Sequence, residues 1–347
     1  MDASTSSTKV TRRTALAVLG SASLGLATMK LSPNTTEPGA ENLRKLLPRF
    51  NEKSRDLLAR LLNAPGFSGR ISAADATKLA QNEGTTVDNL MLDLLPLAQD
   101  FSRRPISNYP VGVVARGDSG SLFLGANIEI PGHSLGFSVH GEQSALSNLY
   151  MHSERGAAAI AVTAAPCGHC RQFMYEMSPD GEVLILVIGK PAVKLSSLLP
   201  AAFGPKDLGS EGGTFPIKEV ELALTKPSTD GLTTAALKSA QMSYAPYSKA
   251  HSAPYTKAHS GVAIATKSGR IFKGSYIENA AFNPSLSPLQ TALAALIVGG
   301  EQYSEISRVA LVEVEGAPIS QKALTEAALG AIAPAVRLEV AMARRRA

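Results

Sequence analysis

Residues 111–129, VGVVARGDSGSLFLGANIE, form the stretch that decides the fold. Two apolar runs flank an Asp-Ser-Gly turn, which is the pattern of a β-hairpin. The pattern returns at residues 260–278, SGVAIATKSGRIFKGSYIE, which match the first stretch at 8 of 19 positions without a gap. A match of this extent at a constant offset of 149 residues indicates an internal repeat about one domain long.

Helix and strand patterns alternate after the first hairpin. HGEQSALSNLYMHSERG (140–156) predicts a helix that ends at Gly156, and AAAIAVTAA (157–165) predicts a buried strand. PCGHCRQFMYEM (166–177) predicts a second helix with Pro166 at its first position, and EVLILVIG (182–189) a further strand. The order β-β-α-β-α-β predicts an α/β fold in which helices flank a mixed sheet.

Helical patterns also precede the first hairpin. ISAADATKLAQNEG (71–84) predicts a short helix capped by Ser72, and TTVDNLMLDLLPLAQDFS (85–102) predicts a longer one capped by Thr85 or Thr86. Residues 201–225 are rich in Gly and Pro and are expected to form a linker. The chain thus divides into an N-terminal extension (1–40), a small helical region (41–85), a first domain (86–200), the linker (201–225) and a second domain (226–347).

Composition argues against two classes of partner. The net charge is only +5, aromatic residues make up 5% and Trp is absent, which disfavours a nucleic-acid-binding surface. The apolar run from Thr14 to Thr28 is too short to span a bilayer comfortably, so no stable membrane insertion is expected. Cysteines that must remain free as thiolates favour a reducing compartment, so a cytoplasmic location is expected. Export or organellar targeting through residues 12–28, which begin with two arginines, is the alternative.

Two short motifs place potential metal ligands at the starts of the two predicted helices. His140, Cys167 and Cys170 supply the nitrogen and sulfur ligands that zinc prefers, and three protein ligands leave a fourth position for water. Glu142 is then well placed to move protons at that water. The order H-x-E…P-C-x-x-C is the signature of zinc deaminases. A structural zinc site and a redox-active C-x-x-C pair are the alternatives.

The second copy keeps the fold pattern but lacks these residues. Placing Gln143 over Gln290 puts Ser287 in the place of His140 and Leu289 in the place of Glu142, and no second C-x-x-C follows. One zinc ion per chain is therefore expected. APYSKAHS (245–252) is followed at once by APYTKAHS (253–260), a tandem duplication just before a predicted strand.

Over residues ~72–300 the chain resembles the dimeric, two-core-domain cytidine deaminases. The resemblance lies in PISNYPVGVVARG, FLGANIE, HGEQSA, APCGHCRQFM, AFGPKDL, SYAPYS and GSYIENAAFNPSLSPLQ. It implies two α-β-α sandwich domains, of which the second is degenerate. It also implies hydrolytic deamination of cytidine and 2′-deoxycytidine in pyrimidine salvage, through water activated by zinc, with Glu142 as the proton carrier.

The resemblance further implies how the substrate is bound. Asn127 and Glu129 match the residues that bind the ribose hydroxyl, and Tyr109 matches an aromatic residue, more often Phe, that stacks on the pyrimidine. Gly141 stands where the family usually has Ala, and its backbone would contact the base. A homodimer is implied, in which ENAAFNPSL (278–286) of the second domain closes the partner's site.

Two other functions are left open by the sequence. One is a zinc-binding protein without turnover, which is suggested by Gly141 in the place where the family usually has Ala. A deaminase of cytosine in nucleic acid is the other, although neither a basic stripe nor aromatic platforms are evident beside the motifs.

Overall fold

The computed structural model describes residues 47–178, 180–214, 217–249 and 257–346. The N-terminal extension, including residues 12–28, lies outside the described residues. Among the helices of the described residues, none has the length and apolar character needed to cross a membrane.

The first of two mixed sheets has six strands in the order β1-β3-β2-β4-β5-β6. β2 and β3 are the predicted first hairpin. β4 and β5 pair in parallel, whereas the other neighbours pair antiparallel. The strands are Arg70–Ile71 (β1), Gly112–Gly117 (β2), Leu122–Ala126 (β3), Ala157–Val162 (β4), Leu184–Val187 (β5) and Val193–Lys194 (β6).

The second sheet has five strands in the order β7-β11-β10-β8-β9. Its part β9-β8-β10-β11 repeats the order β3-β2-β4-β5, again with a parallel pair at the end. This correspondence confirms the internal repeat and the α/β class with two similar domains. The strands are Leu222–Leu224 (β7), Ser260–Thr266 (β8), Ile271–Ser275 (β9), Ile306–Val314 (β10) and Leu338–Arg345 (β11).

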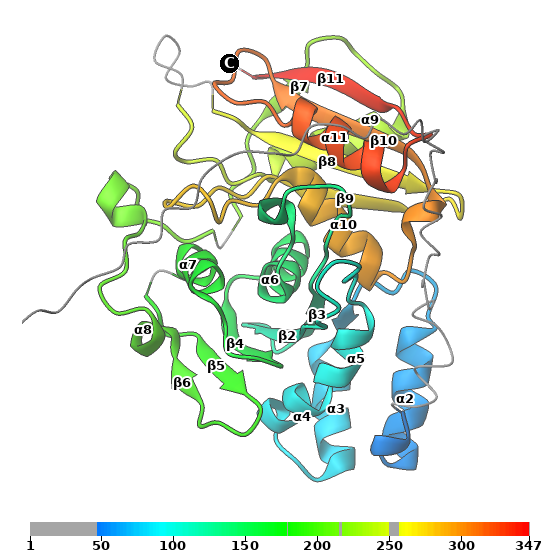
Figure 1. The fold of residues 1–347 in the computed structure, drawn as a ribbon, viewed down its shortest axis with the longest axis vertical. Helices are drawn as coiled ribbons and strands as arrows, with labels where there is room; N and C mark the ends of the chain where they lie inside the picture. The colour runs from blue at the N-terminus through cyan, green and yellow to red at the C-terminus, as the bar shows by residue number, and fades with distance from the viewer. Residues whose placement is uncertain (1–46, 179, 215–216, 250–256, 347) are drawn as a thin grey trace, which may run out of the picture. The chain divides into compact units, whose positions relative to one another are not determined.

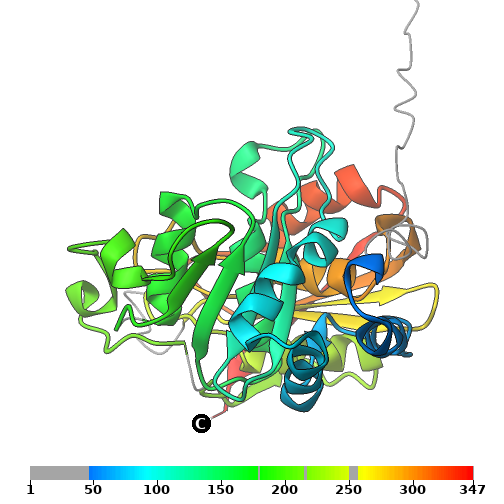
Figure 2. The same cartoon turned by 90° about the horizontal axis from the view of Figure 1, so that it is seen from below.

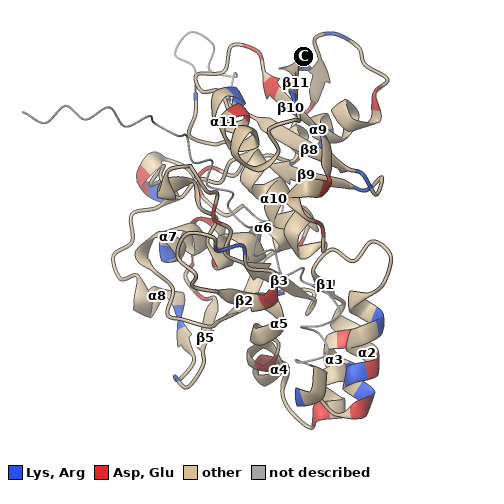
Figure 3. Ribbon diagram, turned by 45° about the vertical axis from the view of Figure 1, so that its right-hand side comes forward, with Lys and Arg blue, Asp and Glu red and all other residues tan. Residues whose placement is uncertain are grey.

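Two buried helices, α6 (Gly141–Met151) and α10 (Pro288–Val298), pack against each other between the sheets (Figure 1). α10 carries no charged residue, and Figure 3 shows charges along the outer helix α2 (Glu52–Leu62) instead. A helix that is apolar on all sides is expected to be buried. One hydrophobic core accordingly includes residues of both sheets and both helices.

Short helices before β2 cover the face of the first sheet opposite α6; they lie in front of the strands in Figure 2. They are α4 (Val87–Asp93) and α5 (Leu95–Asp100), and α3 (Ala73–Glu83) packs against α4. The predicted caps are confirmed, because Ser72 and Thr86 accept hydrogen bonds from Asp75 N and Asn89 N. The single helix predicted after Thr86 is wrong. It breaks before Pro96, which has no N–H to continue the helical hydrogen-bond ladder.

The remaining helices flank the sheets. They are α7 (Gly168–Met177), α8 (Leu195–Leu198), α9 (Gly231–Gln241) and α11 (Lys322–Ile332), with 3₁₀ turns at Leu47–Arg49, Leu135–Phe137, Pro205–Leu208 and Tyr303–Glu305. Strand β7 lies inside the segment expected to be a linker and pairs with β11 at the edge of the second sheet.

The tandem duplication accounts for a change in the offset of the repeat. Arg103 pairs with Ile128 in the first domain, as Tyr244 pairs with Ile277 in the second. The offset is thus 141 before the duplication and 149 after it, a difference of the eight duplicated residues. Ala258 N donates to Ser248 Oγ at 3.0 Å, so the residues on the two sides of the inserted segment lie next to each other.

A buried carboxylate joins the two domains. Glu176, on α7, accepts hydrogen bonds from the hydroxyls of Tyr244 and Tyr247 at 2.7 and 2.6 Å, and from the backbone N–H of Ala280 at 2.8 Å. Burial raises the pKa of Glu176 above its usual value. Three donors from the second domain thus meet the helix that carries the C-x-x-C motif.

Candidate active site

The three predicted metal ligands meet where α6 and α7 begin. The two helices lie side by side (Figure 1). His140 is the residue that caps α6, and the strand-like pairing of Val139 with Ile128 places it there. Cys167 caps α7 in an extended conformation, and Cys170 lies in the first turn of that helix. The prediction that Pro166 is the first helical residue is wrong. The helix begins at Gly168, because the extended Cys167 separates Pro166 from it.

The spacing of the three ligand atoms suits a tetrahedral zinc ion. His140 Nδ1 lies 3.5 Å from Cys167 Sγ and 3.3 Å from Cys170 Sγ, and the two sulfurs are 3.5 Å apart. Ideal Zn–S and Zn–N bonds at tetrahedral angles separate such atoms by about 3.6–3.8 Å. The observed spacing is within a few tenths of an ångström of that. No other cluster of this kind occurs among the residues the structure describes.

Cys167 is prepared to bind a metal ion as a thiolate. The hydrogen bond with the Cys170 thiol, together with backbone N–H groups at the start of α7, lowers the pKa of Cys167 to about 4. Both thiols are free, so no disulfide competes with metal binding. A thiolate is the form of cysteine that ligates metal ions.

Glu142 lies one residue beyond His140 and is 5% exposed. Burial raises the pKa of its carboxyl above the usual value. A raised pKa brings a carboxyl closer to the pH at which it can both take up and release a proton.

Glu142 and His140 line a pocket of about 300 Å³ that we call the Glu142 pocket. The pocket brings together every predicted substrate-binding residue. It also includes residues that the motifs did not single out. The full lining is Ser107, Tyr109, Val111, Asn127, Glu129, Leu135, Ser138, Val139, His140, Gly141 and Glu142.

Asn127 and Glu129 both hold the loop that forms one wall of the Glu142 pocket. Asn127 Oδ1 accepts from Val111 N at 2.9 Å, and its Nδ2 donates to Tyr109 O at 2.9 Å. The carboxylate of Glu129 accepts from the backbone N–H groups of Ile106 and Ser107 at 2.8 and 2.9 Å. It also accepts from the Ser107 hydroxyl. No sequence pattern pointed to Ser107, whose contacts arise only in the folded loop.

The space that an alanine side chain would need at position 141 is filled. A Cβ built on Gly141 would lie 2.9 Å from Val113 Cγ2 and 3.0 Å from Val111 Cγ1. Val111 also lines the Glu142 pocket. The glycine is thus matched to two valines of this chain.

His169 and Arg171 support the ligands in ways that their positions in the motif did not reveal. The His169 ring stacks on that of His140, with centroids 5.1 Å apart and planes inclined at 27°. Arg171 Nε donates to Pro166 O at 2.9 Å, and its Nη1 donates to Leu198 O at 2.8 Å. Arg171 therefore braces the loop that enters Cys167.

The second copy reproduces the backbone of the site without its chemistry. Ser287 caps α10 with φ −64° and ψ 154°, against −77° and 154° for His140 at the start of α6. Leu289 occupies the position of Glu142 and is fully buried. The alignment of Gln143 with Gln290 is confirmed by this correspondence.

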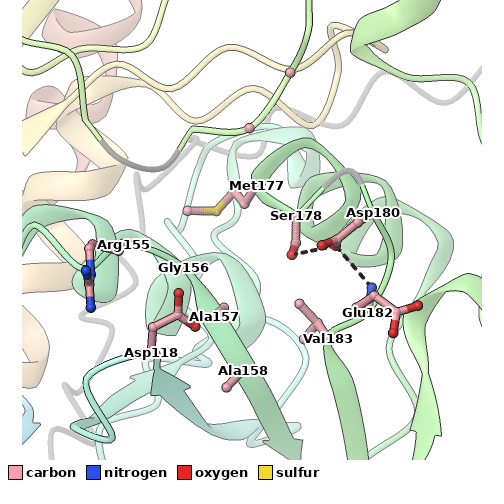
Figure 4. Close-up of a pocket in the computed structure, with 12 residues that line it drawn as sticks. Asp118, Arg155, Gly156, Ala157, Ala158, Met177, Ser178, Asp180, Glu182 and Val183 are labelled. Carbon is pink, nitrogen blue, oxygen red and sulfur yellow. Dashed lines mark hydrogen bonds between the residues drawn. The ribbon is translucent and has the colours of Figure 1, made fainter.

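A larger hollow of about 480 Å³ lies at the other end of α7 and β4 (Figure 4). Met177, at the end of α7, lines it, together with Ala157 at the start of β4 and Asp118 after β2. Asp180 accepts hydrogen bonds from Ser178 Oγ and Glu182 N. α7 has ten residues, so this hollow lies about 15 Å from the cysteine end of the helix.

Comparison with known proteins supports what the geometry indicates. Models of the cytidine and deoxycytidylate deaminase zinc-binding region match residues 85–186 and, a second time, residues 195–326. A cytidine deaminase of Vibrio vulnificus is 41% identical over 277 residues, which cover 80% of this chain and 90% of that protein. This chain belongs to the cytidine deaminase family.

Two further cytidine deaminases match to a similar extent. That of Serratia proteamaculans is 39% identical over 292 residues, covering 82% of this chain and 96% of the relative. That of Cronobacter sakazakii is 42% identical over 275 residues, covering 79% and 90%. The second model match shows that the half without the H-x-E and C-x-x-C motifs is still recognisable as a cytidine and deoxycytidylate deaminase region.

Proposed function

We propose that this protein hydrolyses cytidine and 2′-deoxycytidine to uridine and 2′-deoxyuridine with release of ammonia. The observation that carries the proposal is the Glu142 pocket. A buried carboxyl, the histidine of the metal-ligand cluster and two ribose-binding candidates, Asn127 and Glu129, line one space there. Membership of the cytidine deaminase family supports the same chemistry.

His140, Cys167 and Cys170 are the residues that would hold one zinc ion per chain. Their spacing fits the metal, and one imidazole with two sulfurs is a donor set that zinc prefers. Zinc with three protein ligands supplies a hydroxide nucleophile near neutral pH, because it lowers the pKa of water to about 7.

Glu142 carries the protons of the reaction. Its carboxylate takes a proton from the attacking water and gives it to N3 of the cytosine ring. It then takes up the second proton of that water and delivers it to the departing amine, which leaves as ammonia. One residue can serve both transfers because burial holds its pKa above the usual value.

Asn127, Glu129 and Tyr109 select a nucleoside. We assign two hydrogen bonds to a ribose hydroxyl. The hydroxyl accepts one from Asn127 Nδ2 and donates one to the Glu129 carboxylate. Tyr109 lines the pocket and is 58% exposed, which leaves its ring free to stack on a pyrimidine. The backbone of Gly141, at the start of α6, contacts the base.

We also propose that the active form is a homodimer in which residues 278–286 close the partner's Glu142 pocket. Two apolar residues at that pocket, Leu135 and Tyr109, are largely exposed. Phe282 is 67% exposed and holds a left-handed φ of 61°, an uncommon conformation for a bulky residue. A partner's Phe282 against these side chains would bury apolar surface on both chains.

The domain division 1–40, 41–85, 86–200, 201–225 and 226–347 stands as a proposal, with β7 added to the second domain because it pairs with β11. We place the protein in the cytoplasm, where thiols such as Cys167 and Cys170 stay reduced.

The test is ammonia release by the purified protein from cytidine, 2′-deoxycytidine and a cytosine-containing oligonucleotide. Turnover of both nucleosides, and a loss of about 10²–10⁴-fold in Glu142→Gln with zinc retained, is expected. Zinc binding without ammonia release would instead identify a binding protein without turnover. Turnover of the oligonucleotide alone would identify a nucleic-acid deaminase.

A further inference from the structure

Gln143 and Gln290 occupy equivalent positions in the two domains. Each is the third residue of its helix, Gln143 in α6 and Gln290 in α10. The Oε1 atom of each accepts a hydrogen bond from the backbone N–H of the residue that caps its own helix. The distances are 3.2 Å from His140 N to Gln143 Oε1 and 2.9 Å from Ser287 N to Gln290 Oε1.

The other end of each side chain crosses to the opposite domain. Gln143 Nε2 donates to Pro284 O at 3.1 Å, and Gln290 Nε2 donates to Phe137 O at 3.0 Å. Phe137 and Pro284 each lie three residues before the capping residue of their helix. Both glutamines are buried, at 2% and 7% exposed, so water does not readily replace these bonds.

We propose that Gln290 is a positioning residue for the zinc ligand His140, although it belongs to the domain without metal ligands. The proposal rests on the proposed function, because it takes His140 as a ligand. Gln290 holds the carbonyl of Phe137 at the start of the segment 137–140. The pairing of Val139 with Ile128 holds the middle, and Gln143 holds His140 N at the end.

This segment is both the approach to the metal ligand and a wall of the Glu142 pocket. Ser138 and Val139 line the pocket beside His140. Losing the donor at Phe137 O would leave a carbonyl without that partner and free the segment to shift. Loss of outer partners of a ligand typically weakens metal binding about 10–100-fold. Through the side chain of Gln290, the degenerate domain thus supports the backbone that leads to the metal ligand.

The alternative is that Gln290 only stabilises the start of α10. Two variants separate these roles. Gln290→Met keeps the length of the side chain and removes both its donor to Phe137 O and its acceptor for Ser287 N. The control, Ser287→Ala, removes the cap that Ser287 Oγ provides to Gln290 N at 3.2 Å and leaves the bond to Phe137 in place.

The experiment measures the zinc dissociation constant of the full-length proteins by competition with a chromophoric chelator. Thermal unfolding and the kcat and KM for cytidine are measured in parallel. We expect zinc binding about 10–100-fold weaker in Gln290→Met and within twofold of wild type in Ser287→Ala. Unchanged affinity in Gln290→Met, or an equal loss in the control, would overturn the proposal.

A second variant covers the case in which Gln290→Met does not fold. Gln290→Asn retains the amide but is one methylene shorter, so it cannot span Ser287 N and Phe137 O together, and the same criterion applies. A wild-type protein that binds zinc and deaminates cytidine while the variants keep its affinity refutes only the positioning role. A wild-type protein that binds no zinc refutes the proposed function as well.

Discussion

Replacing Gly141 with Ala sets two effects on stability against each other, the helix propensity of Ala and the tight packing around position 141. Ala is favoured over Gly in a helix by up to about 1 kcal/mol. The added Cβ, however, would lie 2.9 Å from Val113 Cγ2 and 3.0 Å from Val111 Cγ1. β-Branched side chains are stiff about χ1, so the two valines cannot simply rotate away.

The balance predicts a net loss of stability. Overpacking a tight site typically costs about 1–3 kcal/mol, which exceeds the gain in helix propensity. We therefore expect Gly141→Ala to destabilise the fold by about 1 kcal/mol. Deaminase activity should fall too, because position 141 and Val111 both line the Glu142 pocket.

A double-mutant cycle with Val113→Ala tests the cause. Removing the Val113 methyl groups relieves the closest contact and leaves the one with Val111, so Gly141→Ala should cost less stability in that background. Denaturant unfolding of the four proteins should give a coupling of about 0.5–1 kcal/mol. A Gly141→Ala protein that gains about 1 kcal/mol in the wild-type background, with no coupling to Val113, would refute the packing argument.

Three other perturbations follow from contacts described above. Glu129→Gln should raise the KM for cytidine about 10–100-fold with less effect on free cytosine, because it weakens a charged hydrogen bond to ribose; equal effects in steady-state kinetics would make Glu129 structural. Deletion of residues 249–256 should change the free energy of unfolding by less than about 1 kcal/mol, because Ser248 and Ala258 already join the ends; loss of the folded protein would contradict this. His259 should weaken stability at acid pH. Burial lowers its pKa from 6.5 to about 4, so the unfolded chain binds a proton there before the native chain does. Above pH 6.5 His259 is neutral in both states and does not reduce stability. As pH falls from 6.5 toward 4, the free energy of unfolding drops by at most about 3 kcal/mol. His259→Asn should remove that part of the pH dependence of unfolding, and an unchanged profile would exclude His259 as its source.

Local signals in the sequence predicted the elements and ligands that depend on neighbours in the chain. The hairpin repeat fixed two similar sheets, because an apolar alternation and a turn specify a hairpin almost alone. The motifs around His140 and Cys167 placed the ligands at helix starts, where the structure has them. Ser72 and Thr86 acted as caps because a cap bonds to an N–H only three residues away.

What the sequence did not predict depends on contacts between distant segments. Strand β7 has three residues and no periodicity of its own, and it exists because β11 offers it an edge. The bonds from Gln143 to Pro284 and from Gln290 to Phe137 join residues more than 140 apart. The filling of the space at Gly141 by Val111 and Val113 is likewise a property of the packed domain.

We propose that one zinc ion, held by His140, Cys167 and Cys170, supports deamination of cytidine by each chain. The most direct test is to strip the protein with a chelator and to return zinc in steps while ammonia release from cytidine is measured. Activity should rise from near zero to a plateau at one zinc per chain, and Cys167→Ala and Cys170→Ala should hold no stoichiometric zinc. Full activity in the metal-free protein, or stoichiometric zinc in either cysteine variant, would contradict it.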